Sequence, residues 1–149
     1  MEESVKIAES EKLSKEDIEL ASLIGLLHDT ARFEQWMRYE TFSDRKSIDH
    51  GDFGVEILSK DNLIRNFIID DRYDKIIKTA IKNHNKYKIE DGLTEKELLH
   101  SKIIRDADKI DIFYEAAEDM FWNTEEEQNE IQNSLISEDY FNQFINRYN

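Results

Sequence analysis

Ile24-Gly25-Leu26-Leu27-His28-Asp29-Thr30-Ala31-Arg32 is an apolar run that ends in an adjacent imidazole and carboxylate. Apolar residues from Ile18 to Ile24 recur at helical spacing, and His28 continues the face that they form. We therefore expect His28 on the core-facing side of a helix, near its C-terminal end. Asp29 then lies at the negative end of the helix dipole, where an anion is unfavourable unless a cation compensates it. The stretch predicts a metal site.

Two capping boxes predict where helices begin. Ser14-Lys15-Glu16-Asp17 places a serine at the cap position and an acidic residue three positions later. Thr94-Glu95-Lys96-Glu97 repeats the pattern and predicts the longest helix, extending to about Met120. The rest of the chain shows helical spacing without the alternation of strands, and its zero prolines and four glycines agree with that. We expect an all-α fold.

Composition limits both the architecture and the chemistry. A chain of 149 residues with 39% hydrophobic content fits one domain with a sizeable core. We expect a single helical-bundle domain over 1–149, with the candidate ligands in a core of about 5–115 and C-terminal helices at about 124–148 packed on it. The chain has no cysteine, which excludes disulfides, thiolate zinc sites and cysteine nucleophiles. Any metal must therefore be held by nitrogen and oxygen ligands.

The charge of the chain bears on its partners. Lys and Arg residues number 20 against 34 Asp and Glu residues, and the net charge of −14 repels a nucleic-acid backbone. No apolar run approaches the roughly 18 residues of a membrane span, and the N-terminus lacks the apolar region of a signal peptide. We expect a cytoplasmic protein that binds neither nucleic acid nor membrane. The sequence leaves open whether the protein forms a homo-oligomer.

Ligand-type side chains fall at core-facing positions or helix ends in several segments. They are His28, Asp29, His50, His84 and Asp108. The gaps between segments correspond to one or two helices each, and antiparallel helices bring such positions to a shared level in bundle proteins. Mixed imidazole and carboxylate ligands suit manganese, iron, cobalt, nickel or zinc better than calcium. We expect one or two divalent transition-metal ions, and the sequence does not choose among these metals.

The ordered motifs resemble those of the HD-domain phosphohydrolases, a helical family named for its His-Asp doublet. Leu26 to Asp29 with Arg32 match the doublet, and 104–111 resembles the family's late Asp-Lys-x-Asp segment. The segment 49–58 resembles the His-x-x-x-Gly-x-x-x-Leu motif of members that bind two metals, and 83–85 with 91–92 resembles their second histidine segment. The resemblance covers roughly 5–115 and implies an HD-type helical bundle in which Asp29 bridges two ions.

The resemblance also implies a reaction, the metal-dependent hydrolysis of a phosphate ester by activated water. Its expected substrate is a nucleotide or another small phosphate. Asp29, Arg32 and Lys109 are the expected catalytic residues. Arg32, together with Lys86 or Lys109, would offset the charge of the substrate in an otherwise acidic protein.

The chain departs from the family at one position. The family's first ligand is a histidine about one helix before the doublet, whereas residues 1–27 contain no histidine. We expect that an upstream piece is missing from this sequence; the other interpretation is that the protein has lost this ligand.

Two other functions stay open beside the enzyme. A degenerate site would bind a metal or nucleotide as a signal without catalysis. A helical interaction domain would bind no metal, and its thermal stability would not respond to divalent ions. His100 matches no motif, and we expect it to be exposed to solvent.

Overall fold

The computed structural model describes the backbone of residues 2–122 and the side chains of 2–60 and 62–114. This part of the chain contains α-helices, labelled α, and short 3-10 helices, labelled η, and no strand. The predicted all-α fold is confirmed. In chain order the elements are α1 (Glu2–Ser10), α2 (Lys15–Leu27), α3 (Ala31–Tyr39), η1 (Asp44–Lys46), α4 (His50–Ser59), η2 (Lys60–Asn66), η3 (Asp71–Tyr73), α5 (Asp74–Asn83) and α6 (Glu95–Trp122).

Both predicted capping boxes begin helices. The backbone N–H of Asp17 donates to Ser14 Oγ over 3.2 Å and so caps α2. At the start of α6, the Glu97 N–H donates to Thr94 Oγ1 over 3.4 Å, and the Thr94 N–H donates to Glu97 Oε2 over 2.8 Å. These bonds satisfy donors that a helix leaves unpaired at its N-terminus. Within the described residues α6 runs from Glu95 to Trp122 and so includes the predicted stretch up to Met120.

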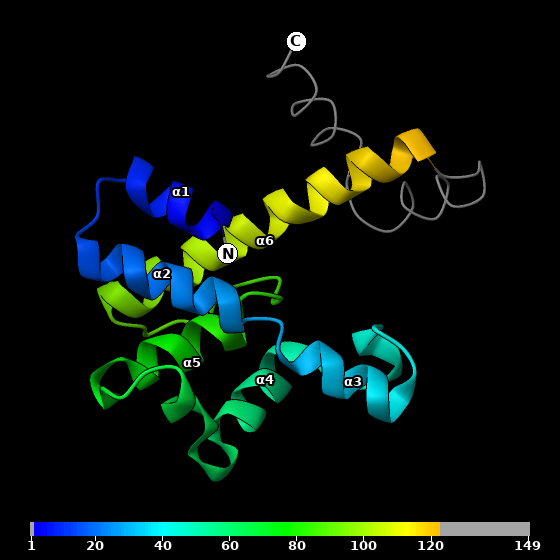
Figure 1. Cartoon of the computed structure of the whole chain (residues 1–149), viewed down its shortest axis with the longest axis horizontal. Helices are drawn as coiled ribbons and strands as arrows, with labels where there is room; N and C mark the ends of the chain where they lie inside the picture. The colour runs from blue at the N-terminus through cyan, green and yellow to red at the C-terminus, as the bar shows by residue number, and fades with distance from the viewer. Residues whose placement is uncertain (1, 123–149) are drawn as a thin grey trace. The chain divides into compact units, whose positions relative to one another are not determined.

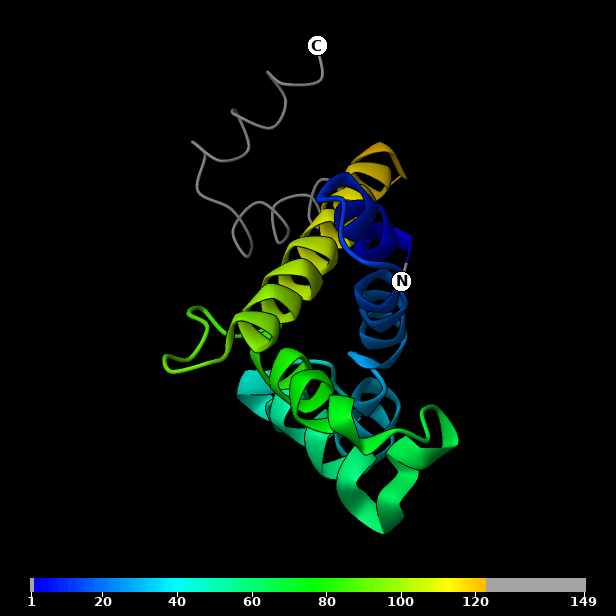
Figure 2. The same cartoon turned by 90° about the vertical axis from the view of Figure 1, so that its left-hand side faces the viewer.

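The helices of the first part of the chain pack as a series of neighbours. Helix α1 contacts α2, α2 contacts α5, α5 contacts α4, and α4 contacts α3 (Figures 1 and 2). A smaller apolar cluster of Ala8, Ala21 and Ile103 joins α1 to α2 and α6. The main core lies among α2, α4, α5 and the first turns of α6, and its burial is the chief stabilising force. Its buried members are Leu20, Ile24, Leu27, Leu58, Ile64, Ile77, Ala80, Ile81 and Ile104.

By its internal contacts the chain divides into two units, Met1–Ile110 and Asp111–Asn149. Every predicted metal ligand belongs to the first unit. The helices predicted at 124–148 lie outside the described residues. Their packing on the core, and the single domain over 1–149, stay predictions.

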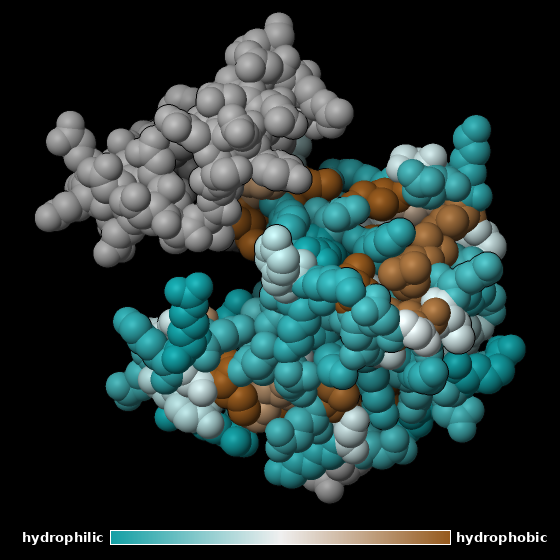
Figure 3. Space-filling view, turned by 180° about the vertical axis from the view of Figure 1, so that it is seen from behind, coloured by the Kyte–Doolittle hydropathy of each residue, from teal (hydrophilic) through white to brown (hydrophobic). Residues whose placement is uncertain are grey.

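The surface agrees with a chain in which 36% of residues are charged. Figure 3 shows one face, on which hydrophilic residues predominate and hydrophobic residues gather in separate patches. None of the helices in the described residues is long and apolar enough to cross a membrane.

Candidate metal centre

Helix ends position the histidines and the central carboxylate. His28 is the C-cap of α2, where its backbone N–H donates to the carbonyl of Ile24 over 2.9 Å. Asp29 follows in the turn before α3. His50 is the first residue of α4, and His84 is the C-cap of α5. The core stripes of α2 and α5 therefore end in imidazoles, while α4 begins with one.

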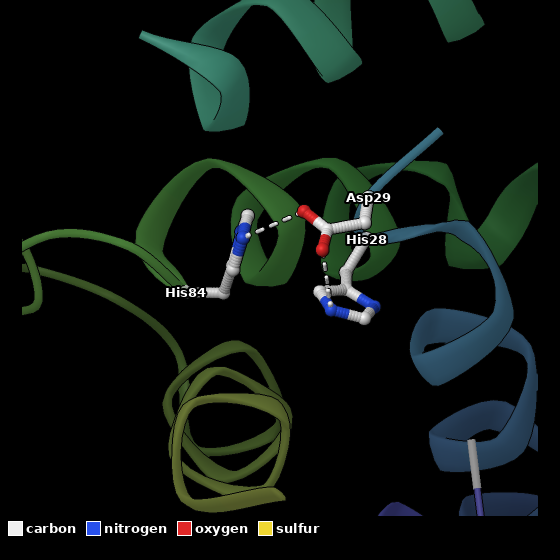
Figure 4. A group of neighbouring side chains, drawn as sticks. All are labelled: His28, Asp29 and His84. Atoms are coloured by element: carbon white, nitrogen blue, oxygen red, sulfur yellow. Dashed lines mark ion pairs between the residues drawn. The ribbon is translucent and has the colours of Figure 1, made fainter. Parts of the chain in front are cut away.

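The Asp29 carboxylate lies between the imidazoles of His28 and His84 (Figure 4). Its Oδ2 is 3.5 Å from His28 Nε2. Its Oδ1 is 3.5 Å from His50 Nε2 and 3.7 Å from His84 Nε2. The ligand atoms of His28, Asp29 and His84 all lie within 4.8 Å of one another. One oxygen of the Asp29 carboxylate thus faces the imidazole of His28, and the other faces the imidazoles of His50 and His84.

Asp108 extends the cluster from α6. Its Oδ1 is 3.6 Å from His28 Nε2, on the side of the cluster that Asp29 Oδ2 also faces. The structure therefore brings together all five predicted ligands, as two overlapping donor sets. One set is His28, Asp108 and Asp29 Oδ2, and the other is His50, His84 and Asp29 Oδ1.

The hydrogen bonds of the imidazoles fix which nitrogen faces Asp29. His28 Nδ1 donates to the Gly25 carbonyl over 2.9 Å, and His84 Nδ1 donates to the Ile81 carbonyl over 2.6 Å. His50 Nδ1 lies 2.6 Å from a carboxylate oxygen of Asp44. Because these oxygens accept, each Nδ1 carries a proton, and in the neutral ring Nε2 then keeps a lone pair. A neutral imidazole with a free Nε2 is the usual form of a histidine metal ligand.

Two observations test whether this donor set fits a metal ion. His50 Nε2 and His84 Nε2 are only 2.9 Å apart, and in neutral rings with a proton on Nδ1 their two lone pairs face each other and repel unless a proton or a metal ion lies against both. Two nitrogens bound at right angles to one ion, with bonds of about 2.1 Å, are about 3.0 Å apart. In addition, the buried Oδ1 of Asp29 has no hydrogen-bond partner, although such an atom is costly to bury unpaired. The residues fit a divalent transition metal.

Comparison with known proteins agrees with this geometry. A family model described as HD domain matches residues 2–112. The chain belongs to the HD-domain family. This is a family of metal-dependent phosphohydrolases whose domains bind divalent metals. No curated protein and no solved structure matches the chain.

Burial and neighbouring charged groups shift the pKa values of the HD doublet and of His50. Burial alone would raise the pKa of Asp29, but the nearby imidazoles of His84, His28 and His50 outweigh it and lower the pKa. Burial likewise lowers the pKa of His50, which favours the neutral imidazole. For His28, burial acts in the same direction, but the contacts with Asp108 and Asp29 outweigh it and raise the pKa. The Asp29 side chain is 44% exposed, so the centre is open to a ligand from solvent.

The three cations predicted to act near the HD site have different surroundings. Arg32 Nε lies 3.5 Å from Asp29 Oδ1, and its NH1 donates to the Phe42 carbonyl and to Asp44 Oδ1 over 2.7 and 3.1 Å. Lys86 Nζ contacts Asp49 and Asp52 at 2.6 and 2.7 Å. Lys109 is exposed and has no ion pair within the described part of the chain. Arg32 is therefore held beside the centre, and Lys109 is the less constrained cation.

Asp44 is a site residue that the sequence analysis missed. It lies in η1, in a polar segment without periodicity, and its Oδ2 contacts His50 Nδ1. Gln35, also missed, is buried in α3 and donates to Asp44 Oδ1 over 3.0 Å. The only sequence signal was an acidic residue six positions before a predicted histidine ligand, which is too common to be informative.

The prediction that His100 is exposed was wrong. His100 is buried, and its Nε2 lies 3.4 Å from Asp17 Oδ1 on α2. It stands three and four residues before Ile103 and Ile104 on α6, and so on the same buried face. A carboxylate partner makes burial of this imidazole tolerable.

Proposed function

We propose that this protein is a metal-dependent phosphohydrolase that acts on a nucleotide or another small phosphate ester. The observation that carries the proposal is the placement of Asp29, whose buried Oδ1 has no hydrogen bond and faces His50 and His84 while its Oδ2 faces His28. Membership of the HD-domain family supports the same chemistry.

The metal ligands in this proposal are His28, Asp29, His50, His84 and Asp108. A divalent ion supplies a Lewis acid for a phosphoryl oxygen and lowers the pKa of the water that it binds. Asp29 joins the two donor sets through its two oxygens. Burial of His50 and His84 keeps their rings in fixed positions and excludes solvent from that side.

Cationic side chains beside the centre would bind the substrate phosphate. Arg32 lies beside Asp29, and 30% of its side chain is exposed to solvent, from which an anion can approach it. Lys109 follows the ligand Asp108 directly on α6 and is exposed. In a chain of net charge −14, such local cations are needed to admit a phosphate group.

The test is turnover by purified full-length protein, stripped of metal and then supplied with Mn²⁺, Fe²⁺, Co²⁺, Ni²⁺ or Zn²⁺. The substrates are p-nitrophenyl phosphate, bis-p-nitrophenyl phosphate and a panel of nucleoside mono- and triphosphates, with product release followed by chromatography. We expect metal-dependent hydrolysis of at least one compound. Asp29→Asn should lower kcat/KM by at least about 100-fold, because it removes the carboxylate shared by both donor sets.

A matched pair on α6 controls for general effects of charge. Asp108→Asn should lose metal affinity and turnover, whereas Asp106→Asn, two residues away at an exposed position, should leave both unchanged. Metal binding by calorimetry without turnover of any compound would contradict the enzyme and favour a non-catalytic metal-binding module. Absence of metal binding would contradict both functions.

A further inference from the structure

Both carboxylate oxygens of Asp44 accept hydrogen bonds from neighbouring side chains. Its Oδ1 accepts from Arg32 NH1 and Gln35 Nε2 at 3.1 and 3.0 Å. Its Oδ2 faces His50 Nδ1 at 2.6 Å, the His50 backbone N–H at 3.4 Å and Asn85 Nδ2 at 3.1 Å. All the contacting groups are donors, so only a group with two acceptor oxygens satisfies them together.

An amide in place of this carboxylate would present an NH₂ group to donors whichever way it turned. Facing Arg32 and Gln35, the NH₂ would break both of their bonds. Facing His50, it would donate to Nδ1 and move the imidazole proton to Nε2, which removes the lone pair directed at Asp29. The carboxylate at position 44 therefore selects the tautomer in which His50 can bind a metal.

We propose that Asp44 is the positioning residue of the His50 and His84 donor set, with Gln35 holding Asp44 in place. The inference rests on the proposed metal binding and adds a residue that acts on it through His50. Gln35 is completely buried and donates also to Ser47 Oγ and the Ile48 carbonyl, at 2.9 and 3.1 Å. These bonds join α3 to the segment that carries Asp44.

The effect of Asp44 falls on one donor set and not on the other. His28 Nδ1 is held by the carbonyl of Gly25 within its own helix, and no contact joins Asp44 to His28 or Asp108 in the described part of the chain. A change at Asp44 should therefore weaken binding at the His50 and His84 side selectively. The donor set of His28 and Asp108 keeps the hydrogen bond from His28 Nδ1 to the Gly25 carbonyl.

The test compares Asp44→Asn and Asp44→Ala with the wild type by calorimetric titration with Mn²⁺ and with Co²⁺. We expect one binding step, that of the His50 and His84 side, to weaken by about 10- to 100-fold in both variants, as loss of a partner that orients a ligand does elsewhere, and a second step, where it is seen, to stay unchanged. Asp44→Ala removes the acceptor without adding a donor, so the inference stays testable if the amide disturbs folding. Circular dichroism and the thermal midpoint verify that each variant is folded.

Asp49→Asn is the matched control. Asp49 caps α4 one residue before His50 and accepts from Asn85 Nδ2 at 3.0 Å, but within the described part of the chain no hydrogen bond or ion pair joins its side chain to the His50 ring. Asparagine caps a helix as well as aspartate does, so metal affinity should stay unchanged. Equal weakening in Asp49→Asn and Asp44→Asn would overturn the proposal, because the loop structure alone would then explain the effect.

A second readout needs no metal. The chain has four histidines, so ¹⁵N NMR of labelled protein can assign the His50 tautomer by single His→Gln variants. We expect Nδ1–H in the wild type and in Asp49→Asn, and a shift toward Nε2–H in Asp44→Asn. An unchanged tautomer with unchanged affinity would overturn the role of Asp44. If the wild type bound no metal, the proposed function would fail, and the tautomer would still report on Asp44.

Discussion

Gly51 follows His50 directly, where the first turn of α4 meets the end of α5. A Cβ atom at this position would lie 2.6 Å from Asn85 Oδ1 and 3.1 Å from the carbonyl oxygens of Ile81 and Lys82. Asn85 does not withdraw freely, because its Nδ2 donates to Asp44 and Asp49. Glycine therefore permits the close approach that sets His50 beside His84.

Gly51→Ala should lower the free energy of unfolding by about 1–3 kcal/mol, because the extra methyl group forces a backbone shift in a packed contact. Gly54→Ala is the control on the same helix, since its nearest contact is a single methyl group of Ile81 at 3.2 Å. Both changes gain similar helix propensity, so the difference between them isolates the clash. Urea denaturation measures it, and equal stabilities would contradict the argument.

The positions of the candidate ligands could be predicted from local sequence, because the helical spacing of apolar residues and the capping residues indicate where helices begin and end. His28 and His84 continue apolar stripes, and His50 follows a capping residue. The contact between Asp44 and His50 depends instead on the path of an irregular segment, which no periodicity encodes. His100 matched no motif, and its partner Asp17 came from a distant helix that the sequence did not place.

At the scale of elements, the cap of α2 holds the helix that ends in the HD doublet. Ser14 Oγ accepts from the Asp17 N–H over 3.2 Å and donates to Asp17 Oδ2 over 2.6 Å. Ser14→Ala should cost about 1 kcal/mol of stability, the usual value of an N-cap. The control is Ser10→Ala, because the exposed Ser10 donates only to the carbonyl of Ile7 in its own helix. Thermal unfolding compares the two, and equal midpoints would show that the cap contributes nothing.

Helix α3 was not predicted, and its polarity explains why. Phe33 and Met37 are 80% and 78% exposed, whereas the opposite face buries Ala31 and the polar Gln35. An amphipathic helix normally buries its apolar face, so the pattern here is reversed. Gln35 tolerates burial because its amide bonds to Asp44, Ser47 and the Ile48 carbonyl. A helix that packs through a polar network gives no apolar stripe to recognise.

At the scale of the whole first unit, Asp17 joins α2 to α6. Lys96 Nζ lies 2.9 Å and His100 Nε2 lies 3.4 Å from Asp17 Oδ1, and Ser14 donates to the other oxygen. Burial alone would raise the pKa of Asp17, but the hydrogen bonds from Ser14, Lys96 and His100 outweigh it and lower the pKa to about 2. The ordinary value is 3.8, so the folded protein holds the charged form more firmly than the unfolded chain does.

This difference predicts how stability depends on pH. The folded-state pKa is the lower one, so the contribution of Asp17 is complete above the unfolded value of 3.8 and is lost as pH falls toward about 2. The full contribution is about 2 kcal/mol, and about 1 kcal/mol of it should disappear between about pH 5 and about pH 3. Urea denaturation of the wild type and Asp17→Asn should therefore show a stability gap that narrows over this range. A constant gap for Asp17→Asn would mean that the link between α2 and α6 does not depend on the charge of Asp17.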